Sequence, residues 1–262
     1  MNRKEILEQL ASGKISVEEA EKYLNSNQIE IVEEFAKYDI FREARTGIPE
    51  VIYSETKSPE MVVEIVKKVL EKKKIVLLSR LTEKHIPKID ELINDFSVEY
   101  GTGKKFCVIR RHDYISSKEN GKIGIITAGT SDIPVAEEAK AIAEMMGCEV
   151  IMTHDVGVAG IHRLFEPLNN LLKRDIDALI VAAGMEGALP TVVAGLVDVP
   201  VIGLPISTGY GFGGKGETAL MSMLQSCALG IAVVNIDGGI SAGAMAAKIA
   251  QRVNKKCEKE II

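Results

Sequence analysis

The chain has 262 residues, enough for one large domain or two modest ones with hydrophobic cores of their own. Hydrophobic residues make up 46% and charged residues 26%, a balance typical of globular proteins, which excludes disorder as the main state. The net charge of −5 excludes a general binder of nucleic acid or anionic membranes, because both need a dominant positive field. The first residues, MNRKEILEQLASGK, lack the apolar core of a signal peptide, and no run of about 18 apolar residues could span a membrane. We therefore expect a cytoplasmic protein.

Glycine content divides the chain into two regions. Residues 1–118 hold 4 glycines with 21 basic and 21 acidic side chains, whereas residues 119–262 hold 19 glycines with 11 basic and 16 acidic side chains. Glycine gathers where backbone turns tightly or approaches a ligand, so the second region is the place to look for chemistry. We predict two domains, 1–118 and 119–262, joined by the polar segment 116–122.

The first region reads as a small α/β domain. One helix is predicted after Ser16, because Glu19 three residues later completes a capping-box pattern. A second is predicted after Ser58, with Pro59 at its first position, through residues 61–74. A strand over 75–78, a helix over 82–95 and a strand over 106–109 follow.

The second region alternates strand-like and helix-like segments. Strands are predicted over 122–129, 148–153, 177–184, 200–205 and 230–236, with helices near 134–146, 160–173, 188–197, 216–228 and 240–253. The strand-like runs are apolar at nearly every position, which suits strands covered on both faces, as in a parallel sheet. The predicted fold class is therefore α/β, with a doubly wound parallel sheet preceded by a smaller α/β domain. Such a sheet binds ligands beyond the carboxyl ends of its strands.

Polar residues follow each of the first three predicted strands. Those after the first strand could hold a phosphate on backbone N–H groups or simply cap the next helix. Those after the second suit acid–base or anion contacts better than metal binding, or else form surface ion pairs. After the third, a glutamate flanked by glycines is a candidate for chemistry, or a solvated loop acid. The candidates are Gly129, Thr130, Ser131 and Asp132, then His154, Asp155, His162 and Arg163, then Gly184, Met185, Glu186 and Gly187.

The fourth predicted strand leads into the glycine-rich run PISTGYGFGGKGE. It could cradle a phosphate or a ring, or act as a flexible lid, but it is not a phosphate-binding P-loop because Gly216 follows Lys215. The candidate binding residues here are Ser207, Thr208, Gly209, Tyr210 and Gly211.

The four cysteines, Cys107, Cys148, Cys227 and Cys257, form no CxxC pair and no metal-ligand spacing, so free thiols are expected. Cys227 is predicted near the end of the helix that follows the glycine-rich run. Among Met, Leu and Ala it reads as a small buried hydrophobe, unless its surroundings favour a thiolate.

Six of these segments together resemble the LarB family of nickel-pincer nucleotide cofactor biosynthesis proteins: AGTSD, THDVGVAGIHR, AAGMEGALP, PISTGYGFGG, MLQSC and VVNIDGG. The resemblance continues into FREARTGIPEVIYSETKS, residues 41–58. The second region also resembles the PurE family of aminoimidazole ribonucleotide carboxylases and mutases, with a flavodoxin-like, three-layer fold. Where PurE proteins carry the histidine of GAAHLPG, this chain has Ala188, whereas His154 matches another PurE histidine.

The LarB resemblance implies a carboxylase and hydrolase that converts nicotinic acid adenine dinucleotide and CO₂ to pyridinium-3,5-biscarboxylic acid mononucleotide and AMP. By similarity Cys227 is the nucleophile and Glu186 the active-site glutamate, with His154 and His162 as alternative proton shuttles. A thiolate added at carbon 4 of the pyridinium ring would make the neighbouring carbon nucleophilic. Two readings remain open beside this one: a PurE-like carboxylase or mutase, and a dinucleotide-binding protein without catalysis.

The resemblance also implies partners. Mg²⁺ or another divalent cation would offset charge on the diphosphate, with ligands that the sequence does not identify, and no organic prosthetic group is expected. Arg42 and Arg45 could clamp the dinucleotide or form surface ion pairs. Similarity to PurE implies a homo-oligomer, and an octamer in particular.

Overall fold

The computed structural model describes residues 3–25, 30–32, 36–39, 42–116 and 120–260. The chain divides into two compact units, which are treated separately: unit 1 is Met1–Glu99 with Phe106–Tyr114, and unit 2 is Tyr100–Lys105 with Ile115–Ile262. The predicted domain boundary, between 118 and 119, falls within 117–119, outside the described residues. The segment 100–105 joins unit 2 because Thr102 donates its backbone N–H and its hydroxyl to the Glu137 carboxylate, at 2.7 and 3.1 Å.

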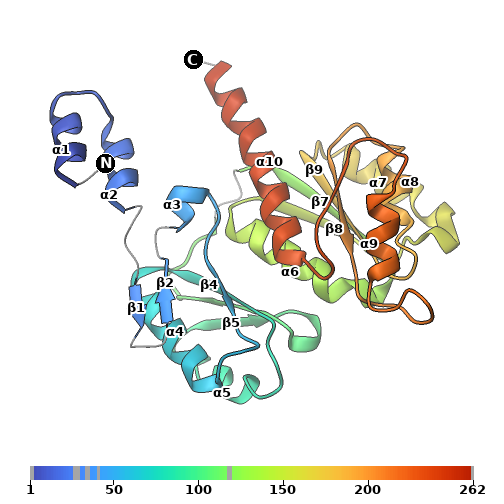
Figure 1. Ribbon diagram of the computed structural model, residues 1–262, viewed down its shortest axis with the longest axis horizontal. Helices are drawn as coiled ribbons and strands as arrows, with labels where there is room; N and C mark the ends of the chain where they lie inside the picture. Colours follow the sequence, from blue (N-terminus) through green and yellow to red (C-terminus); the bar gives the residue numbers. More distant parts are fainter. Residues whose placement is uncertain (1–2, 26–29, 33–35, 40–41, 117–119, 261–262) are drawn as a thin grey trace. The chain divides into compact units, whose positions relative to one another are not determined.

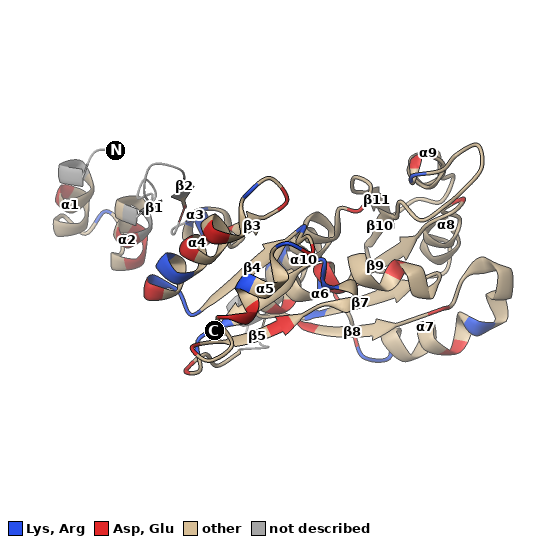
Figure 2. Cartoon of the chain, turned by 90° about the horizontal axis from the view of Figure 1, so that it is seen from below, with Lys and Arg blue, Asp and Glu red and all other residues tan. Residues whose placement is uncertain are grey.

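Unit 1 is built around a four-stranded sheet in the order β3-β4-β6-β5 (Figure 1). The predicted strands at 75–78 and 106–109 are confirmed as β4 (Ile75–Ser79) and β6 (Cys107–Arg110), which pair antiparallel. The helix predicted after Ser58 is also confirmed as α4 (Pro59–Lys72), whose Met61 N–H bonds to the Ser58 hydroxyl at 3.3 Å. Helix α4 carries both acidic and basic residues (Figure 2), while its inner face buries Val, Ile and Leu side chains.

The N-terminal part of unit 1 begins with two helices, α1 (Arg3–Ala11) and α2 (Val17–Asn25). The capping box predicted for α2 is confirmed, since Glu19 N–H bonds to the Ser16 hydroxyl and Ser16 N–H to the Glu19 carboxylate, at 3.1 and 2.9 Å. Five short elements were not predicted from the sequence, because three to five residues carry too little periodicity. They are β1 (Glu30–Val32), β2 (Ala36–Tyr38), α3 (Arg42–Thr46), β3 (Val51–Tyr53) and β5 (Ser97–Tyr100).

The helix predicted over 82–95 is wrong: only α5 (Ile86–Asp90) is helical there. The buried His85 side chain accepts the Thr82 N–H at 3.0 Å, and its other ring nitrogen lies 3.1 Å from the Lys57 carbonyl oxygen. The His85 side chain thus ties the start of this segment to the chain just before α4.

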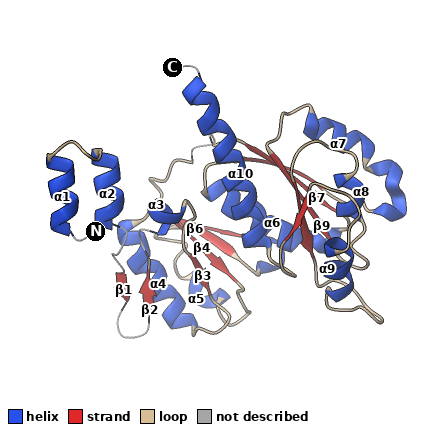
Figure 3. Cartoon of the chain, turned by 45° about the horizontal axis from the view of Figure 1, so that its top comes forward, coloured by secondary structure: helices blue, strands red, loops and turns tan. Residues whose placement is uncertain are grey.

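Unit 2 confirms the predicted doubly wound parallel sheet. Its strands lie in the order β11-β10-β9-β7-β8, and every pairing is parallel. Helices α6 and α10 cover one face and α7, α8 and α9 the other, as Figure 3 shows. The strands are β7 (Lys122–Thr127), β8 (Glu149–Thr153), β9 (Ala178–Ala183), β10 (Val201–Pro205) and β11 (Ile231–Val233). The helices are α6 (Ile133–Met145), α7 (Phe165–Leu172), α8 (Leu189–Ala194), α9 (Glu217–Leu224) and α10 (Gly239–Glu260), with two 3₁₀ turns, η2 (Thr130–Asp132) and η3 (Val158–Arg163).

The side on which successive strands join the sheet changes after β8, so that β9 pairs with the other edge of β7. The chain moves outward from β7 to β8 on one side and then returns to place β9, β10 and β11 on the other. Loops that follow β7 and β9 therefore diverge and leave a crevice beyond the carboxyl ends of the two strands. Both strands are buried, with Ile123, Ile125, Leu179 and Val181 fully excluded from solvent, so the crevice has a rigid floor.

Two predicted helices of unit 2 are shorter than expected. The segment 188–197 is helical only over α8, and the segment 216–228 only over α9. Helix α9 ends at Leu224 because the Ser226 hydroxyl accepts the Ala228 N–H at 3.1 Å and turns the chain. Cys227 therefore lies in a loop and not in a helix. In the described part of the chain, no helix is both long enough and apolar enough to cross a membrane.

Candidate functional site

A cavity of about 210 Å³ lies at the reversal point, beyond the carboxyl ends of β7 and β9. Four turns form its walls: those after β7, β9 and β10, and the turn that opens η3. Seven predicted site residues line it, namely Gly129, Ser131, Asp132, Gly184, Met185, Glu186 and Thr208. Gly157, Val158, Ala159, Ala188 and Leu189 complete the wall, with Ala128 and Ala183. The cavity is therefore where a doubly wound sheet is expected to bind its ligand.

Asp132 connects two walls of the cavity. Its carboxylate accepts the Gly129 N–H at 2.8 Å and also a hydrogen bond from the backbone of Gly184, so it joins the turn after β7 to the turn after β9. Only 3% of the residue is exposed. Burial raises the pKa of the Asp132 carboxyl, and the two backbone N–H groups offset part of that rise. Asp132 is thus a carboxylic acid with a raised pKa in the cavity lining.

The turn that presents Glu186 is held against the glycine-rich loop, residues 207–216. Met185 donates its N–H to the Thr208 carbonyl at 2.8 Å. A Cβ at position 184 would lie 2.5 Å from that same carbonyl oxygen, so the close approach requires Gly184. Met185 has a φ of +54°, a conformation that a residue with a side chain rarely adopts unless its surroundings impose it. The exposed Glu186 carboxylate is therefore aimed by a constrained turn.

Gly129 differs from Gly184. Its φ of −132° is open to any residue. The nearest atom to a Cβ built there would be 3.7 Å away. Glycine is not required at this position by the backbone of this chain.

The electrostatic character of the cavity is negative. Asp132 and Glu186 are the titratable residues in its lining, which contains no Lys, Arg or His among the described residues. A pair of carboxylates in a partly closed site stabilises a positive charge and opposes a second negative one. The cavity therefore suits a cationic or neutral ring better than a phosphate group.

The candidates after β8 do not line the cavity. His154 directly follows β8 and His162 lies in η3, and both are exposed. Arg163 pairs with Asp155 at 2.7 Å, and both side chains are about half exposed, so this is a surface ion pair of small energetic weight. Asp155 and Arg163 thus form a surface ion pair, which was the alternative to acid–base or anion contacts.

The remaining candidates surround the mouth of the cavity or lie in its turns. Ser207 donates its N–H to the Asp237 carboxylate at 2.9 Å, which anchors the start of the glycine-rich loop. Asp237 follows the last strand, and the sequence analysis did not include it among the candidate site residues. Thr130, Gly209, Tyr210 and Gly211 are exposed, whereas Gly187 is buried against Ala219 of α9.

Cys227 is an exposed free thiol, in contrast to the buried Cys107 and Cys148. Burial raises the pKa of Cys148 to about 12 and raises that of Cys107 as well, so neither forms a thiolate readily. The side chain of Cys257 lies outside the described residues. The expectation of free thiols is confirmed for the three described cysteines.

The position of Cys227 separates it from the cavity within one chain. It lies between the end of α9 and the start of β11, and Gly230, three residues later, accepts the Val201 N–H at 3.0 Å. Val201 is the first residue of β10, so this loop lies at the amino edge of the parallel sheet. The cavity lies at the carboxyl edge. The parallel topology alone places Cys227 at the amino edge. A helix that follows one parallel strand must return the chain to that edge before the next strand begins.

The side chains that line the cavity offer few ligands for a metal ion. The described residues contain no group of three or more His, Cys, Asp or Glu side chains arranged for a metal ion. Asp132 and Glu186 are the carboxylates available. One or two carboxylates fit Mg²⁺ only when substrate phosphates supply further oxygens.

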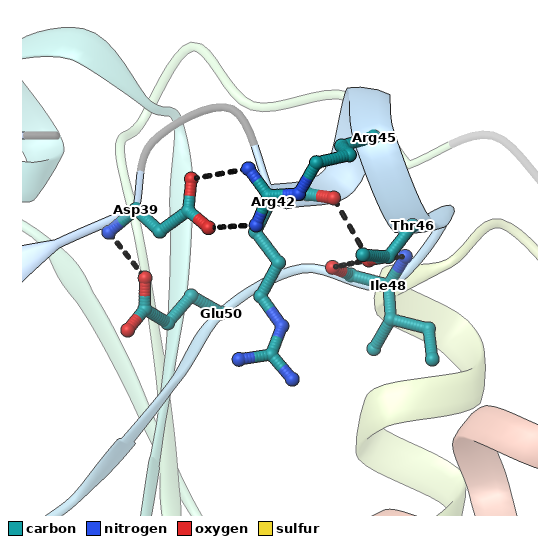
Figure 4. A network of polar contacts seen from close by, with 6 residues as sticks. All are labelled: Asp39, Arg42, Arg45, Thr46, Ile48 and Glu50. Atoms are coloured by element: carbon teal, nitrogen blue, oxygen red, sulfur yellow. Dashed lines mark hydrogen bonds and ion pairs between the residues drawn. The ribbon is translucent and has the colours of Figure 1, made fainter. Parts of the chain in front are cut away.

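Arg42 and Arg45 belong to unit 1, where Figure 4 shows their surroundings. Arg45 forms an ion pair with Asp39, whose own N–H bonds to the Glu50 carboxylate. In Figure 4 no dashed line reaches the Arg42 guanidinium, whose positive charge acts on the nearby Glu50 carboxyl and opposes part of the rise in its pKa. Burial raises the pKa of the Glu50 carboxyl, and Tyr38 donates its hydroxyl to the Glu50 carbonyl at 3.0 Å. Arg45 is thus engaged in a surface ion pair, the alternative to a ligand clamp, and the role of Arg42 stays a prediction.

Comparison with known proteins places these observations in a family. A family model described as AIR carboxylase matches residues 122–262, and one described as LarB/PurE-like N-terminal domain matches residues 29–111. An uncharacterized protein of Methanocaldococcus jannaschii is 45% identical, over 97% of this chain and 99% of its own. The N5-carboxyaminoimidazole ribonucleotide mutases of Thermotoga maritima and Pyrococcus abyssi are 32% and 33% identical, over 49% of this chain and 74% and 72% of theirs. The chain therefore belongs to the family in which a LarB/PurE-like N-terminal domain precedes an AIR carboxylase domain, the LarB architecture.

Proposed function

We propose that the chain is a LarB-type enzyme that carboxylates nicotinic acid adenine dinucleotide and cleaves its diphosphate to release AMP. Family membership supports an enzyme of the carboxylase or mutase type. The observation that carries the choice of substrate is the cavity, which holds two carboxylates and no basic side chain among its described lining residues. A pyridinium ring has a fixed positive charge, and these carboxylates would stabilise it.

A PurE-like reaction on a purine precursor fits the cavity less well. PurE substrates carry a neutral imidazole ring, which lacks the fixed positive charge that the two carboxylates would stabilise. Ala188, at the position of a PurE histidine, lies in the cavity wall. The wall thus carries a methyl group where the PurE reaction places an ionisable ring.

The proposed reaction begins with the Cys227 thiolate. Its sulfur forms a bond to carbon 4 of the pyridinium ring, and the ring electrons make carbon 5 nucleophilic. Carbon 5 then bonds to CO₂, and Glu186 accepts the proton that carbon 5 loses. Departure of the sulfur from carbon 4 restores the aromatic ring and the thiolate. Cys227 is thus consumed and regenerated in each turnover.

This chemistry requires a second copy of the chain, because Cys227 and the cavity lie at opposite edges of one sheet. The side chains near Cys227 support such an assembly. Met221, Leu224 and Leu229 are all exposed, and monomeric proteins rarely leave apolar groups of this kind clustered at the surface. Contact of this surface with another copy would bring Cys227 to the cavity of its neighbour. The octamer implied by similarity stays a prediction.

The proposed reaction also includes cleavage of the diphosphate. Water would add to one phosphorus as the bridging oxygen leaves with the other, and a Mg²⁺ ion, if bound, would offset the negative charge of the diphosphate. Asp132 or Glu186 would provide a carboxylate to hold that ion.

The direct test is to incubate the protein with nicotinic acid adenine dinucleotide, ¹³C-bicarbonate and Mg²⁺ and to analyse the products by mass spectrometry. We expect AMP together with a pyridinium mononucleotide that has gained one labelled carboxyl group. Absence of both products would reject the proposal in favour of a binding protein. Turnover of an aminoimidazole ribonucleotide instead would favour the PurE-like reaction.

A further inference from the structure

The cavity is too small for a whole dinucleotide. Pockets that enclose drug-sized ligands have volumes of roughly 300–1,000 Å³, whereas this one has about 210 Å³. If the pyridinium end occupies it, as the proposed function requires, the adenosine half must lie on the surface around the mouth. The inference below rests on that function and concerns where this second half binds.

The glycine-rich loop between β10 and α9, in the orange part of Figure 1, starts at the mouth of the cavity. Thr208 lines the cavity, and the chain then runs outward through Tyr210 and Phe212. Tyr210 is 83% exposed and Phe212 is fully exposed, although aromatic side chains of this size are usually covered at least in part. Two uncovered rings therefore stand next to the mouth.

Both ends of this loop are fixed to the rest of unit 2. The Thr208 carbonyl accepts the Met185 N–H at 2.8 Å, and the Gly213 carbonyl accepts the Thr218 N–H at 3.4 Å. Between these anchors, a Cβ added at Gly211 would meet no atom within 4 Å. The rings are therefore carried by a short segment that has fixed ends and open space around its tip.

We infer that Tyr210 and Phe212 form a stacking subsite for the adenine ring of the dinucleotide. Aromatic side chains stack on the face of a nucleobase without specific hydrogen bonds, which explains why bare rings flanked by glycines suffice. Lys215, on the same loop, has no ion-pair partner among the described residues and can approach the diphosphate between the two rings of the substrate. In this arrangement the cavity takes the pyridinium ring and the two aromatic rings take the adenine, while Lys215 of the same loop supplies a positive charge for the diphosphate.

The chain contains no tryptophan, so Phe212→Trp would introduce a single fluorophore at the subsite. With excitation selective for tryptophan, we expect saturable quenching by AMP and by nicotinic acid adenine dinucleotide, and none by nicotinic acid mononucleotide, which lacks adenine. The matched control is Phe165→Trp, at a half-exposed aromatic position on α7, where all three ligands should leave the emission unchanged. Emission from Trp at position 212 that does not respond to AMP or to the dinucleotide would overturn the inference.

A second measurement uses Phe212→Ala and Phe212→Tyr. Loss of one stacked ring should weaken dinucleotide binding roughly tenfold and leave mononucleotide binding unchanged, and the tyrosine variant should restore the affinity. Equal dinucleotide affinity in the wild type and Phe212→Ala would contradict the subsite. The two proposals can fail separately: carboxylation that is insensitive to Phe212→Ala, with a silent fluorophore, rejects the subsite alone, whereas quenching by AMP without any carboxylation rejects the proposed reaction alone.

Discussion

Replacement of Gly184 by alanine tests how the cavity is held together. The new Cβ would lie 2.5 Å from the Thr208 carbonyl oxygen and 3.0 Å from the Thr208 Cβ, so the turn and the glycine-rich loop must separate. Forced overpacking of this kind costs about 1–3 kcal/mol. Separation also weakens the hydrogen bond from Met185 N–H to the same carbonyl, which contributes about 0.5–1.5 kcal/mol. We expect the variant to lose about 2–4 kcal/mol of unfolding free energy.

The matched control is Gly129→Ala, in the same cavity, where the nearest atom to the new Cβ is 3.7 Å away. Urea unfolding followed by circular dichroism gives the midpoint and slope for each variant. We expect a clear fall in midpoint for Gly184→Ala and a change within about 0.5 kcal/mol for Gly129→Ala. If the two variants were equally stable, the close contact between the turn and the loop would not exist as described.

Three further predictions concern single side chains. The Asp132→Asn variant should gain stability relative to the wild type as pH rises from about 3.9 through the raised pKa of Asp132, because burial disfavours the ionised wild-type carboxylate. Urea midpoints of both proteins between pH 4 and 7 measure this gain, and a stability difference that does not change with pH would contradict it. Met185→Gly relieves a left-handed conformation that costs about 1–2 kcal/mol but adds about 0.5–1 kcal/mol of backbone entropy cost, so thermal unfolding should show equal or slightly higher stability, and a clear loss would argue against strain. Cys227→Ser should change stability by less than about 0.5 kcal/mol because the side chain is exposed, yet abolish carboxylation in the mass-spectrometric assay; undiminished carboxylation would reject the covalent step.

The sheet of unit 2 was predictable because buried parallel strands are apolar along their whole length. All five of its strands were located from that pattern alone, and so was the edge at which the cavity lies. The strands of unit 1 were harder to predict from the sequence, since β1, β2, β3 and β5 have only three or four residues each. In the segment 82–95, where a longer helix was expected, the buried His85 ring lies 3.1 Å from the carbonyl oxygen of Lys57, a contact that the local sequence pattern does not convey.

In the candidate site, too, residues could be predicted from their place after a strand, whereas contacts between segments far apart in the sequence could not. Asp132 and Glu186 were found because each follows a strand directly, and those strands meet at one edge. The partner of Asp132 at Gly184 and the contact of Gly184 with Thr208 join segments that only the fold brings together. The place of Cys227 at the opposite edge follows from strand direction, which spacing along the sequence does not convey by itself.

Mixing two inactive variants tests most directly whether Cys227 of one copy serves the cavity of another. Cys227→Ser and Glu186→Gln are co-expressed in equal amounts. A shared site is intact when a Glu186→Gln copy supplies the thiol and a neighbouring Cys227→Ser copy supplies the carboxylate. With random assembly we expect about a quarter of wild-type carboxylation, because each intact partner is present with a probability of about one half. The double variant co-expressed with Cys227→Ser should remain inactive. No recovery of activity in the first mixture, with wild-type oligomers active, would contradict a site shared between copies.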